Sequence, residues 1–413
     1  MSGTGSTAGV AGVEATAGTS GVAATITAGA PEIAGAPVTT GGGGDAPAVI
    51  SPAGRGPYPV GMSNFEIAPT NLSAEELEAY LEGSRDDSGT LHYVDEIFAA
   101  PNSVLLTNVA VPNDPSLYGE ASGTTLPVAA YVAYPTSSDN TRPDYAFPYP
   151  GVPIGFSRME RPGDMPLLAS DAAKYPLVIL SHGHMSHGLW DIGRARTFAS
   201  HGFIVLVLSH GDERFLPLVD IDLPVRALRS LEEKSVLDRL LEASPYGSFV
   251  DRNRIAMIGL SFGAVTVLAA LGAELDQIAG TVHDPRIYAG IADSPFVGSI
   301  VDANDFFQFG PQNVGLAAVQ RPLLFIYGTA DTVAPPSYLL SALPRLMGTR
   351  YVVEFTGQPH VFSTDFQQDR INWELLFLQA YLKDDDAALA LLKKAGSVAG
   401  LGEDHQQFEY QHP

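Results

Sequence analysis

The chain has 413 residues, of which 45% are hydrophobic and 17% are charged, a composition typical of soluble globular proteins that excludes disorder along its whole length. Its 46 acidic residues outnumber 23 lysines and arginines, and the net charge of −23 disfavours binding to nucleic acid or anionic lipid. Cysteine is absent, which excludes disulfides, thiolate metal ligands and a cysteine nucleophile.

The N-terminal segment, residues 1–56, is composed mainly of Gly, Ala, Thr, Ser and Val, and this composition predicts a low-complexity flexible tail. Residues 57–413 are then expected to form a single catalytic domain. No lysine or arginine precedes Arg55, and no continuous apolar core follows, so the pattern is not that of a secretory signal. We expect a cytoplasmic protein, or a secreted one if a signal has been removed. No run of about 18 apolar residues predicts a transmembrane segment.

The first half of the folded part contains one predicted helix, one predicted strand and a long connection. Residues 72–83 offer Ser73 as an N-cap and Glu76 three residues later, which predicts a short helix. Residues 126–135 have the composition of a strand. The following connection, residues 136–174, is rich in Pro, Asp and Gly and is long enough to form a wall of a substrate cleft.

The second half alternates buried-looking strands with helical segments, which predicts an α/β fold with a mostly parallel central sheet covered by helices on both faces. One segment, residues 223–244, has helical periodicity. It is expected to form either a lid or a helix that packs over the sheet, and packing is the favoured alternative. In such sheets, ligands bind beyond the carboxyl ends of the strands. The predicted strands are residues 175–183, 202–211, 254–261, 287–295, 322–331 and 351–357.

The sequence Gly259-Leu-Ser-Phe-Gly263 stands where an apolar strand changes directly into an Ala- and Leu-rich helix. A turn this tight exposes the hydroxyl of Ser261 above the sheet, and the flanking glycines avoid the clashes of a Cβ. The N-terminus of the following helix favours the negative charge that develops during acyl transfer. Ser261 is therefore the candidate nucleophile.

A serine hydroxyl needs a base within hydrogen-bond reach and a carboxylate that orients this base. Asp331 directly follows one predicted strand, and His360 lies in a loop after the next. The order Ser, Asp, His is that of the α/β-hydrolases. Alternatively, Asp331 caps a turn and His360 is an ordinary loop histidine. Asp293, at the end of the preceding strand, is the rival acid.

Three histidines, His182, His184 and His187, fall in one short loop after a strand. Their spacing matches no common zinc motif, and we predict no metal site. We expect the loop to supply a backbone N–H to the oxyanion hole from His184, with a second N–H from Phe262. The side chains of His184 and Trp190 are then expected to line the substrate cleft.

The motifs GPYPVG, YPLVILSHG, ASHGF, DRNRIAMIGLSFG, RPLLFIYGTAD and QPHVF, in this order, resemble a group of α/β-hydrolases. This group includes the platelet-activating-factor acetylhydrolases, the bacterial polyester hydrolases and proteins described as predicted dienelactone hydrolases. The resemblance covers about residues 56–382. It implies Ser261 as nucleophile, Asp331 as acid and His360 as base, with oxyanion amides from Phe262 and His184.

Two features depart from the patterns of these relatives. True dienelactone hydrolases use a cysteine nucleophile, and secreted polyester hydrolases commonly carry a C-terminal disulfide, whereas this chain contains no cysteine. The sequence therefore predicts a serine carboxylic-ester hydrolase that needs no cofactor and acts on small uncharged esters with short or medium acyl chains. The alternatives are a peptidase or acyltransferase on the same fold, a polyester or lipid ester hydrolase, and a non-catalytic binding protein.

Overall fold

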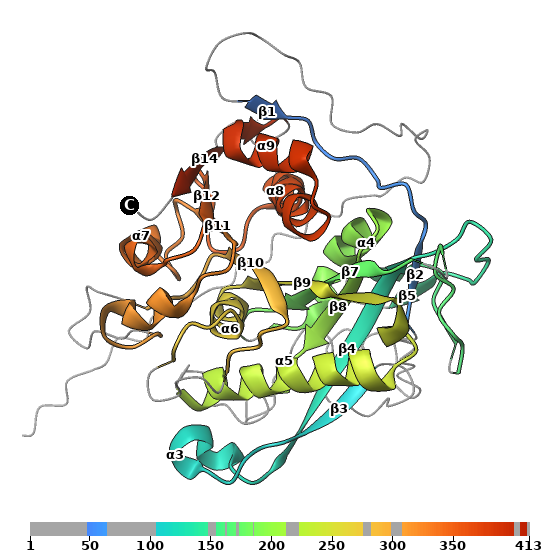
Figure 1. The fold of residues 1–413 in the computed structure, drawn as a ribbon, viewed down its shortest axis with the longest axis horizontal. Coiled ribbons are helices and arrows are strands. Elements are labelled where there is room, and N and C mark those ends of the chain that lie inside the picture. Colours follow the sequence, from blue (N-terminus) through green and yellow to red (C-terminus); the bar gives the residue numbers. More distant parts are fainter. Residues whose placement is uncertain are drawn as a thin grey trace, which may run out of the picture.

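A ten-stranded sheet occupies the centre of the computed structural model, which describes residues 48–63, 105–147, 154–161, 163–170, 173–184, 186–211, 223–275, 282–298, 308–399 and 405–410 (Figure 1). The strand order is β14-β12-β11-β10-β9-β7-β8-β4-β2, and β3 pairs with β4. The strands are β2 (Val60–Met62), β3 (Leu105–Ala110), β4 (Thr125–Pro135), β7 (Tyr175–Ser181), β8 (Ile204–Ser209), β9 (Val250–Leu260), β10 (Ile287–Asp293), β11 (Leu323–Gly328), β12 (Arg350–Phe355) and β14 (His405–Tyr410).

Strand direction divides the sheet into a parallel centre and antiparallel edges. The strands β8, β7, β9, β10, β11 and β12 run parallel to their neighbours. At the edges, β14 pairs antiparallel with β12, and β4 pairs antiparallel with β8, β2 and β3. The six parallel strands are those predicted from the sequence, and every residue of β8 and β11 is buried. Continuous apolar runs are required here because both faces of the sheet are covered.

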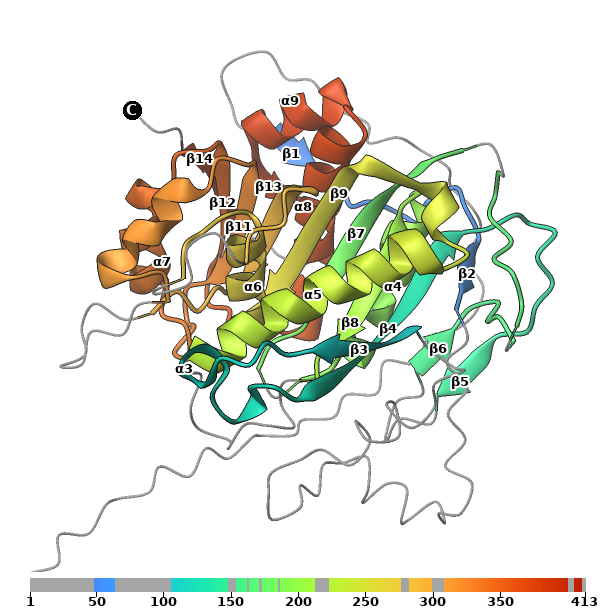
Figure 2. The ribbon, with the colours of Figure 1, turned by 60° about the horizontal axis from the view of Figure 1, so that its bottom comes forward.

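Helices cover both faces of the sheet (Figure 2). The helices α5 (Leu223–Ala243) and α6 (Phe262–Ala270) contribute to one hydrophobic cluster, and α4 (Ile192–Ser200), α8 (Thr364–Leu382) and α9 (Asp386–Lys394) contribute to the other. The predicted α/β architecture is thus confirmed. The smaller elements are α3 (Pro115–Tyr118), α7 (Pro336–Ala342) and the 3₁₀ turns at Gly119–Ala121, Gly188–Asp191, Gly247–Phe249, Pro311–Ala318 and Leu343–Arg345.

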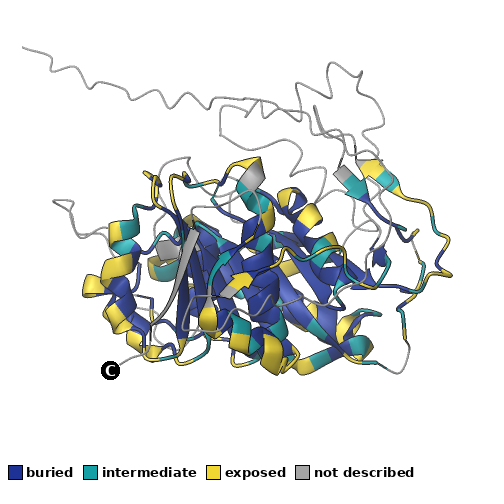
Figure 3. Cartoon of the chain, turned by 90° about the horizontal axis from the view of Figure 1, so that it is seen from above, coloured by how far each residue is buried: buried dark blue, intermediate teal, exposed yellow. Residues whose placement is uncertain are grey.

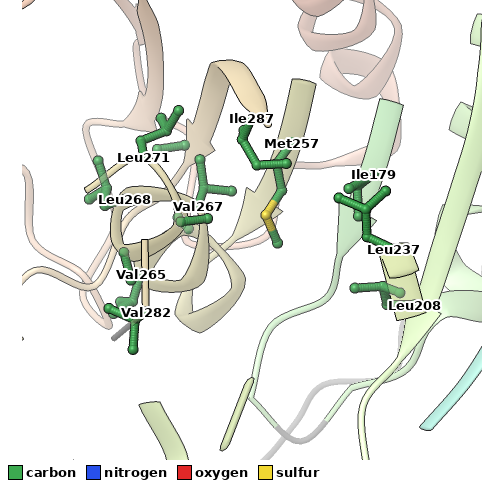
Figure 4. Packing of buried hydrophobic residues seen from close by; sticks show 14 of the residues in the cluster. Ile179, Leu208, Leu237, Met257, Val265, Val267, Leu268, Leu271, Val282 and Ile287 are labelled. Atoms are coloured by element: carbon green, nitrogen blue, oxygen red, sulfur yellow. The ribbon is translucent and has the colours of Figure 1, made fainter. Parts of the chain in front are cut away.

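The core beneath α5 and α6 combines aliphatic side chains from the sheet and both helices with buried tyrosines and phenylalanines, and Figure 4 shows part of it. Leu237 of α5 lies beside Ile179 and Leu208. Val267 of α6 packs against β10, where a Cβ on Gly290 would lie 2.7 Å from its side chain. All residues of α6 are buried, and the outer helices alternate buried and exposed faces (Figure 3). Because α5 buries apolar residues in this core, the structure favours a helix that covers the sheet rather than a lid.

The segment before β2 joins the folded body. Strand β1 (Ala48–Ile50) pairs in parallel with β13 (Ala395–Val398), and Ile50 is buried in the cluster below α8 and α9. The N–H of Ala53 donates to Asn372 Oδ1 at 2.8 Å. The expected tail, residues 1–56, therefore overlaps the folded body at residues 48–56, and residues 1–47 lie outside the described part.

Two other sequence predictions concern connections. The predicted helix at residues 72–83 lies outside the described residues. Within residues 136–174, the strands β5 (Tyr145–Phe147) and β6 (Ile154–Phe156) form a small antiparallel pair. The segment is anchored to the body by Glu160, whose carboxylate accepts hydrogen bonds of 2.6 Å from the hydroxyls of Tyr134 and Tyr246. Among the described helices, none is both long and apolar enough to cross a membrane.

Candidate active site

The carboxyl ends of the parallel strands meet at one edge because the strands pair in register. Ser181 of β7 lies opposite Gly259 of β9, and Leu260 of β9 lies opposite Asp293 of β10. Asp293 in turn lies opposite Ile326 of β11. Residues that directly follow these strands are thereby brought to a common edge, which is where ligands bind in sheets of this kind.

Ser261 occupies a strained turn between β9 and α6. Its φ of 55° and ψ of −113° lie outside the conformations that non-glycine residues usually adopt. Its N–H donates to the carbonyl of Asp293 at 2.8 Å, which ties the turn to the neighbouring strand. A Cβ on Gly259 would lie 2.1 Å from the carbonyl oxygen of Gly263. The glycine is thus required by a close backbone approach, as the motif predicted.

Asp331 and His360 form a hydrogen-bonded pair at the same edge. The Oδ2 atom of Asp331 lies 2.8 Å from Nδ1 of His360. The other oxygen, Oδ1, accepts hydrogen bonds from the backbone N–H groups of Val333 and Ala334 at 2.9 and 2.8 Å. The carboxylate is buried, and the imidazole is 15% exposed. A carboxylate held by its own turn orients the imidazole so that Nε2 is the ring atom left for chemistry.

Ser294 connects the nucleophile turn to the histidine loop, a role that sequence reasoning missed. It directly follows Asp293, and its hydroxyl donates to the carbonyl of His360 at 3.1 Å. Its own N–H donates to the carbonyl of Ile326 at 2.7 Å, and its φ is 42°. A second strained residue therefore holds the His360 loop against the strand that also binds the Ser261 N–H.

The rival acid, Asp293, belongs to a buried ionic cluster on the α4 and α8 side. Its Oδ2 accepts a hydrogen bond of 2.9 Å from Arg194 Nη2, and Arg370 Nη1 lies 3.9 Å away. Arg194 also donates to Asp191 and to Glu374, at 2.9 and 2.6 Å. Burial raises the pKa of Glu374 to about 8, against the opposing charge of Arg194. Arg194 nevertheless binds both oxygens of Glu374, at 2.6 and 3.2 Å, so the carboxyl groups of the cluster are held by arginine.

The two residues expected to supply the oxyanion amides lie together. Phe262 is the first residue of α6 and is fully buried, and its ring lies 6.2 Å from the ring of His184 in an edge-to-face arrangement. Gly183 is also close to the nucleophile, because a Cβ built on it would lie 3.5 Å from Cβ of Ser261. The loop after β7 and the nucleophile turn therefore pack against each other.

The other loop histidines differ in environment. His182 is buried, its Nε2 accepts the N–H of His210 at 3.0 Å, and burial lowers its pKa well below the usual range. Burial also lowers the pKa of His187 to about 3, and its ring stacks on Trp190 at 5.7 Å. Trp190 is 63% exposed. In the described ranges, no group of three His, Asp or Glu side chains is arranged to hold a metal ion.

A groove of about 470 Å³ lies beside α4. It is lined by Ala53, Gly54, Arg55, Val60, Ser157, Gly193, Arg196, Thr197, Ser200 and Gln368. Ser157 comes from the connection expected to wall the substrate cleft, but no candidate catalytic residue lines this groove. The groove is therefore separate from the edge that carries Ser261.

Comparison with known proteins finds a distant relative. Over 265 residues, the chain is 24% identical to the platelet-activating factor acetylhydrolase of Cavia porcellus. The match covers 54% of this chain and 56% of that protein, so the chain spans about half the length of the relative. No family model matches the chain. The relative and the mostly parallel sheet agree with the resemblance stated above, and the fold is that of the α/β-hydrolases.

Proposed function

We propose that this protein is a serine carboxylic-ester hydrolase that uses Ser261 as nucleophile, His360 as base and Asp331 as the orienting acid. The observation that carries the proposal is the 2.8 Å hydrogen bond between His360 Nδ1 and Asp331 Oδ2, at the sheet edge where Ser261 holds a φ of 55°. The similarity to an acetylhydrolase supports ester hydrolysis as the general activity.

The proposed reaction has two stages. His360 Nε2 takes the proton of Ser261 as Oγ attacks the acyl carbon, and it then gives this proton to the departing alcohol. Water next attacks the acyl-enzyme, again through His360, and releases the acid and the free serine. During both stages, Asp331 stabilises the imidazolium, and the amides of Phe262 and His184 stabilise the oxyanion.

The surroundings of these residues favour uncharged esters with short or medium acyl chains. The residue after His360, Val361, is 62% exposed, and Val333, two residues after Asp331, is 55% exposed. Trp190 adds an exposed aromatic ring after β7. Apolar acyl groups lose water favourably against such side chains, whereas a charged group would have to give up hydration. The net charge of −23 also repels anionic substrates at low salt.

The test is kcat/KM for a series of aryl esters from acetyl to palmitoyl, with a peptide anilide and a carboxylate-bearing ester beside them. We expect a maximum at short to medium chains, little anilide cleavage, and loss of turnover in Ser261→Ala. A maximum at palmitoyl would indicate a lipase, and efficient anilide cleavage would indicate a peptidase. Turnover by Ser261→Ala above about a thousandth of the wild-type rate would contradict the proposed nucleophile.

A further inference from the structure

We propose that Arg229 of α5 is a positioning residue that fixes the oxyanion hole by holding the Gly183–His184 peptide and the Phe262 ring at once. This inference rests on the proposed function, because it assigns a role within that reaction. It adds a residue that lies on a covering helix, outside the Ser261, Asp331 and His360 set.

Arg229 is fully buried and reaches the loop after β7 with both ends of its guanidinium group. Its Nη1 donates to the carbonyl of His182 at 2.6 Å, and its Nη2 donates to the carbonyl of Gly183 at 3.2 Å. A planar guanidinium has donors in a fixed fork, so two successive carbonyls are held in one geometry. The loop that carries His184 therefore has little freedom to rotate its peptide planes.

A second donor completes the hold on the Gly183 carbonyl. His182 Nε2 accepts a backbone N–H from His210, so its proton is on Nδ1, which lies 2.8 Å from the Gly183 oxygen. This oxygen thus accepts two hydrogen bonds, one from Arg229 and one from His182. The lowered pKa of His182 keeps its ring neutral, which preserves this arrangement at physiological pH.

The orientation of this carbonyl determines the orientation of the His184 amide, because both belong to one peptide unit. The unit is trans, and in a trans peptide the N–H points opposite to the carbonyl. With the Gly183 oxygen held towards Arg229, the His184 N–H is directed away from it. A 180° rotation of this peptide would exchange the proposed oxyanion donor for a carbonyl, which would repel the developing negative charge.

The same guanidinium group also contacts the residue that supplies the second proposed amide. The Cζ atom of Arg229 lies 4.7 Å from the centre of the Phe262 ring, a distance at which cation–π attraction is favourable. Phe262 begins α6 directly after Ser261, so this contact holds the start of the helix against α5. One side chain therefore sets the positions of both proposed donors relative to each other.

The experiment compares Arg229→Met, Arg229→Lys and the control Arg350→Met with the wild type. Arg350 is also fully buried, and it donates to the carbonyl of Gly348. It is the first residue of β12 and therefore lies at the amino end of its strand, away from the carboxyl ends that carry the site. For each folded protein, kcat and KM are measured with an acetyl aryl ester, together with inhibition by an alkylboronic acid, whose tetrahedral serine adduct requires the oxyanion hole. Thermal unfolding gives the folded fraction at the assay temperature.

We expect kcat of Arg229→Met to fall tenfold to a hundredfold per folded molecule, because misplacing a donor costs less than the hundredfold or more for removing one. KM should stay within threefold, and boronate affinity should fall in parallel with kcat/KM. Arg229→Lys can reach only one carbonyl and should retain an intermediate kcat. If Arg229→Met does not accumulate as folded protein, a fall of at least fivefold in Arg229→Lys is the supporting result.

A merely structural role predicts a different pattern. Wild-type kcat per folded molecule in both Arg229 variants, or an equal loss of kcat in Arg350→Met, would overturn the inference. Ser261→Ala, measured beside these variants, separates this failure from failure of the proposed function. An inactive Ser261→Ala with a fully active Arg229→Met refutes the role of Arg229 alone, whereas an active Ser261→Ala refutes the serine mechanism itself.

Discussion

Replacing the two competing acids, Asp331 and Asp293, with asparagine should separate catalysis from stability. In Asp331→Asn, the side-chain oxygen can still accept the N–H groups of Val333 and Ala334, so the turn is retained. The side-chain amide, however, now presents a donor to His360 Nδ1 where the carboxylate presented an acceptor. The imidazole then adopts the tautomer that cannot accept the serine proton.

The expected loss in Asp331→Asn follows from this change of tautomer. Substitutions of this kind in serine hydrolases lower kcat by about four orders of magnitude, which corresponds to about 5 kcal/mol of transition-state stabilisation. Stability should fall by only about 1 kcal/mol, because the two backbone hydrogen bonds to the turn remain. The measurements are kcat with an acetyl aryl ester and the free energy of unfolding in urea.

Asp293→Asn should show the reverse pattern. Its carboxylate binds Arg194 in the buried cluster, and removal of one partner from such a cluster is usually costly. Burial raises the pKa of Glu374, and loss of the neighbouring Asp293 charge favours its ionised form, so we expect a loss of about 2 kcal/mol in stability. The backbone carbonyl that holds the Ser261 N–H remains, and kcat per folded molecule should stay within tenfold. A larger kcat loss in Asp293→Asn than in Asp331→Asn would refute the assignment of the acid.

Three further predictions concern stability. Gly263→Ala places a Cβ 2.2 Å from a backbone oxygen of β7 and should lower the free energy of unfolding in urea by at least 3 kcal/mol. In the control Gly193→Ala, the new Cβ has nothing within 4 Å, and stability should be unchanged or increased. Equal effects of the two substitutions would contradict this packing. Burial, followed by the charge of a neighbouring aspartate, raises the pKa of Glu233 to about 8, so folding takes up a proton and stability falls as pH rises from about 4.5 to 8. Glu233→Gln should reduce the fall in the free energy of unfolding over this pH range by up to about 5 kcal/mol. Parallel plots of unfolding free energy against pH for the variant and the wild type would refute this role of Glu233. Deleting residues 1–47 should leave kcat and the free energy of unfolding unchanged. Deleting residues 1–56 also removes strand β1 and the buried Ile50, and should lower the free energy of unfolding by about 2–4 kcal/mol. Equal unfolding curves for the two truncated proteins would contradict the role of this segment.

The features of the site that the sequence predicts are those with a local cause. The change from an apolar strand to an Ala-rich helix across Gly259 and Gly263 is visible within twenty residues, and the structure has the turn at that place. The six parallel strands are also predictable, because each is a continuous apolar run bounded by polar residues.

The features that escape sequence reasoning depend on contacts between distant segments. Asp293 ends a buried strand and Asp331 follows one, and what distinguishes their environments is Arg194, 99 residues before Asp293, together with residues of α8. Arg229 stands in a charged stretch of α5 that is typical of an exposed helix face, yet it is fully buried. Strand β1 has three residues in a Gly- and Ala-rich segment, and its partner β13 lies near the other end of the chain.

The most direct test of the central claim is to locate the adduct formed with a fluorophosphonate, which reacts with serines activated by a neighbouring base. Intact-mass measurement and peptide mapping of the wild type are predicted to give one adduct, on Ser261, with complete loss of ester turnover. His360→Ala, in which the base is missing, should react at least a thousandfold more slowly. An adduct on another serine with loss of activity, or full ester turnover after complete labelling of Ser261, would contradict the serine hydrolase mechanism.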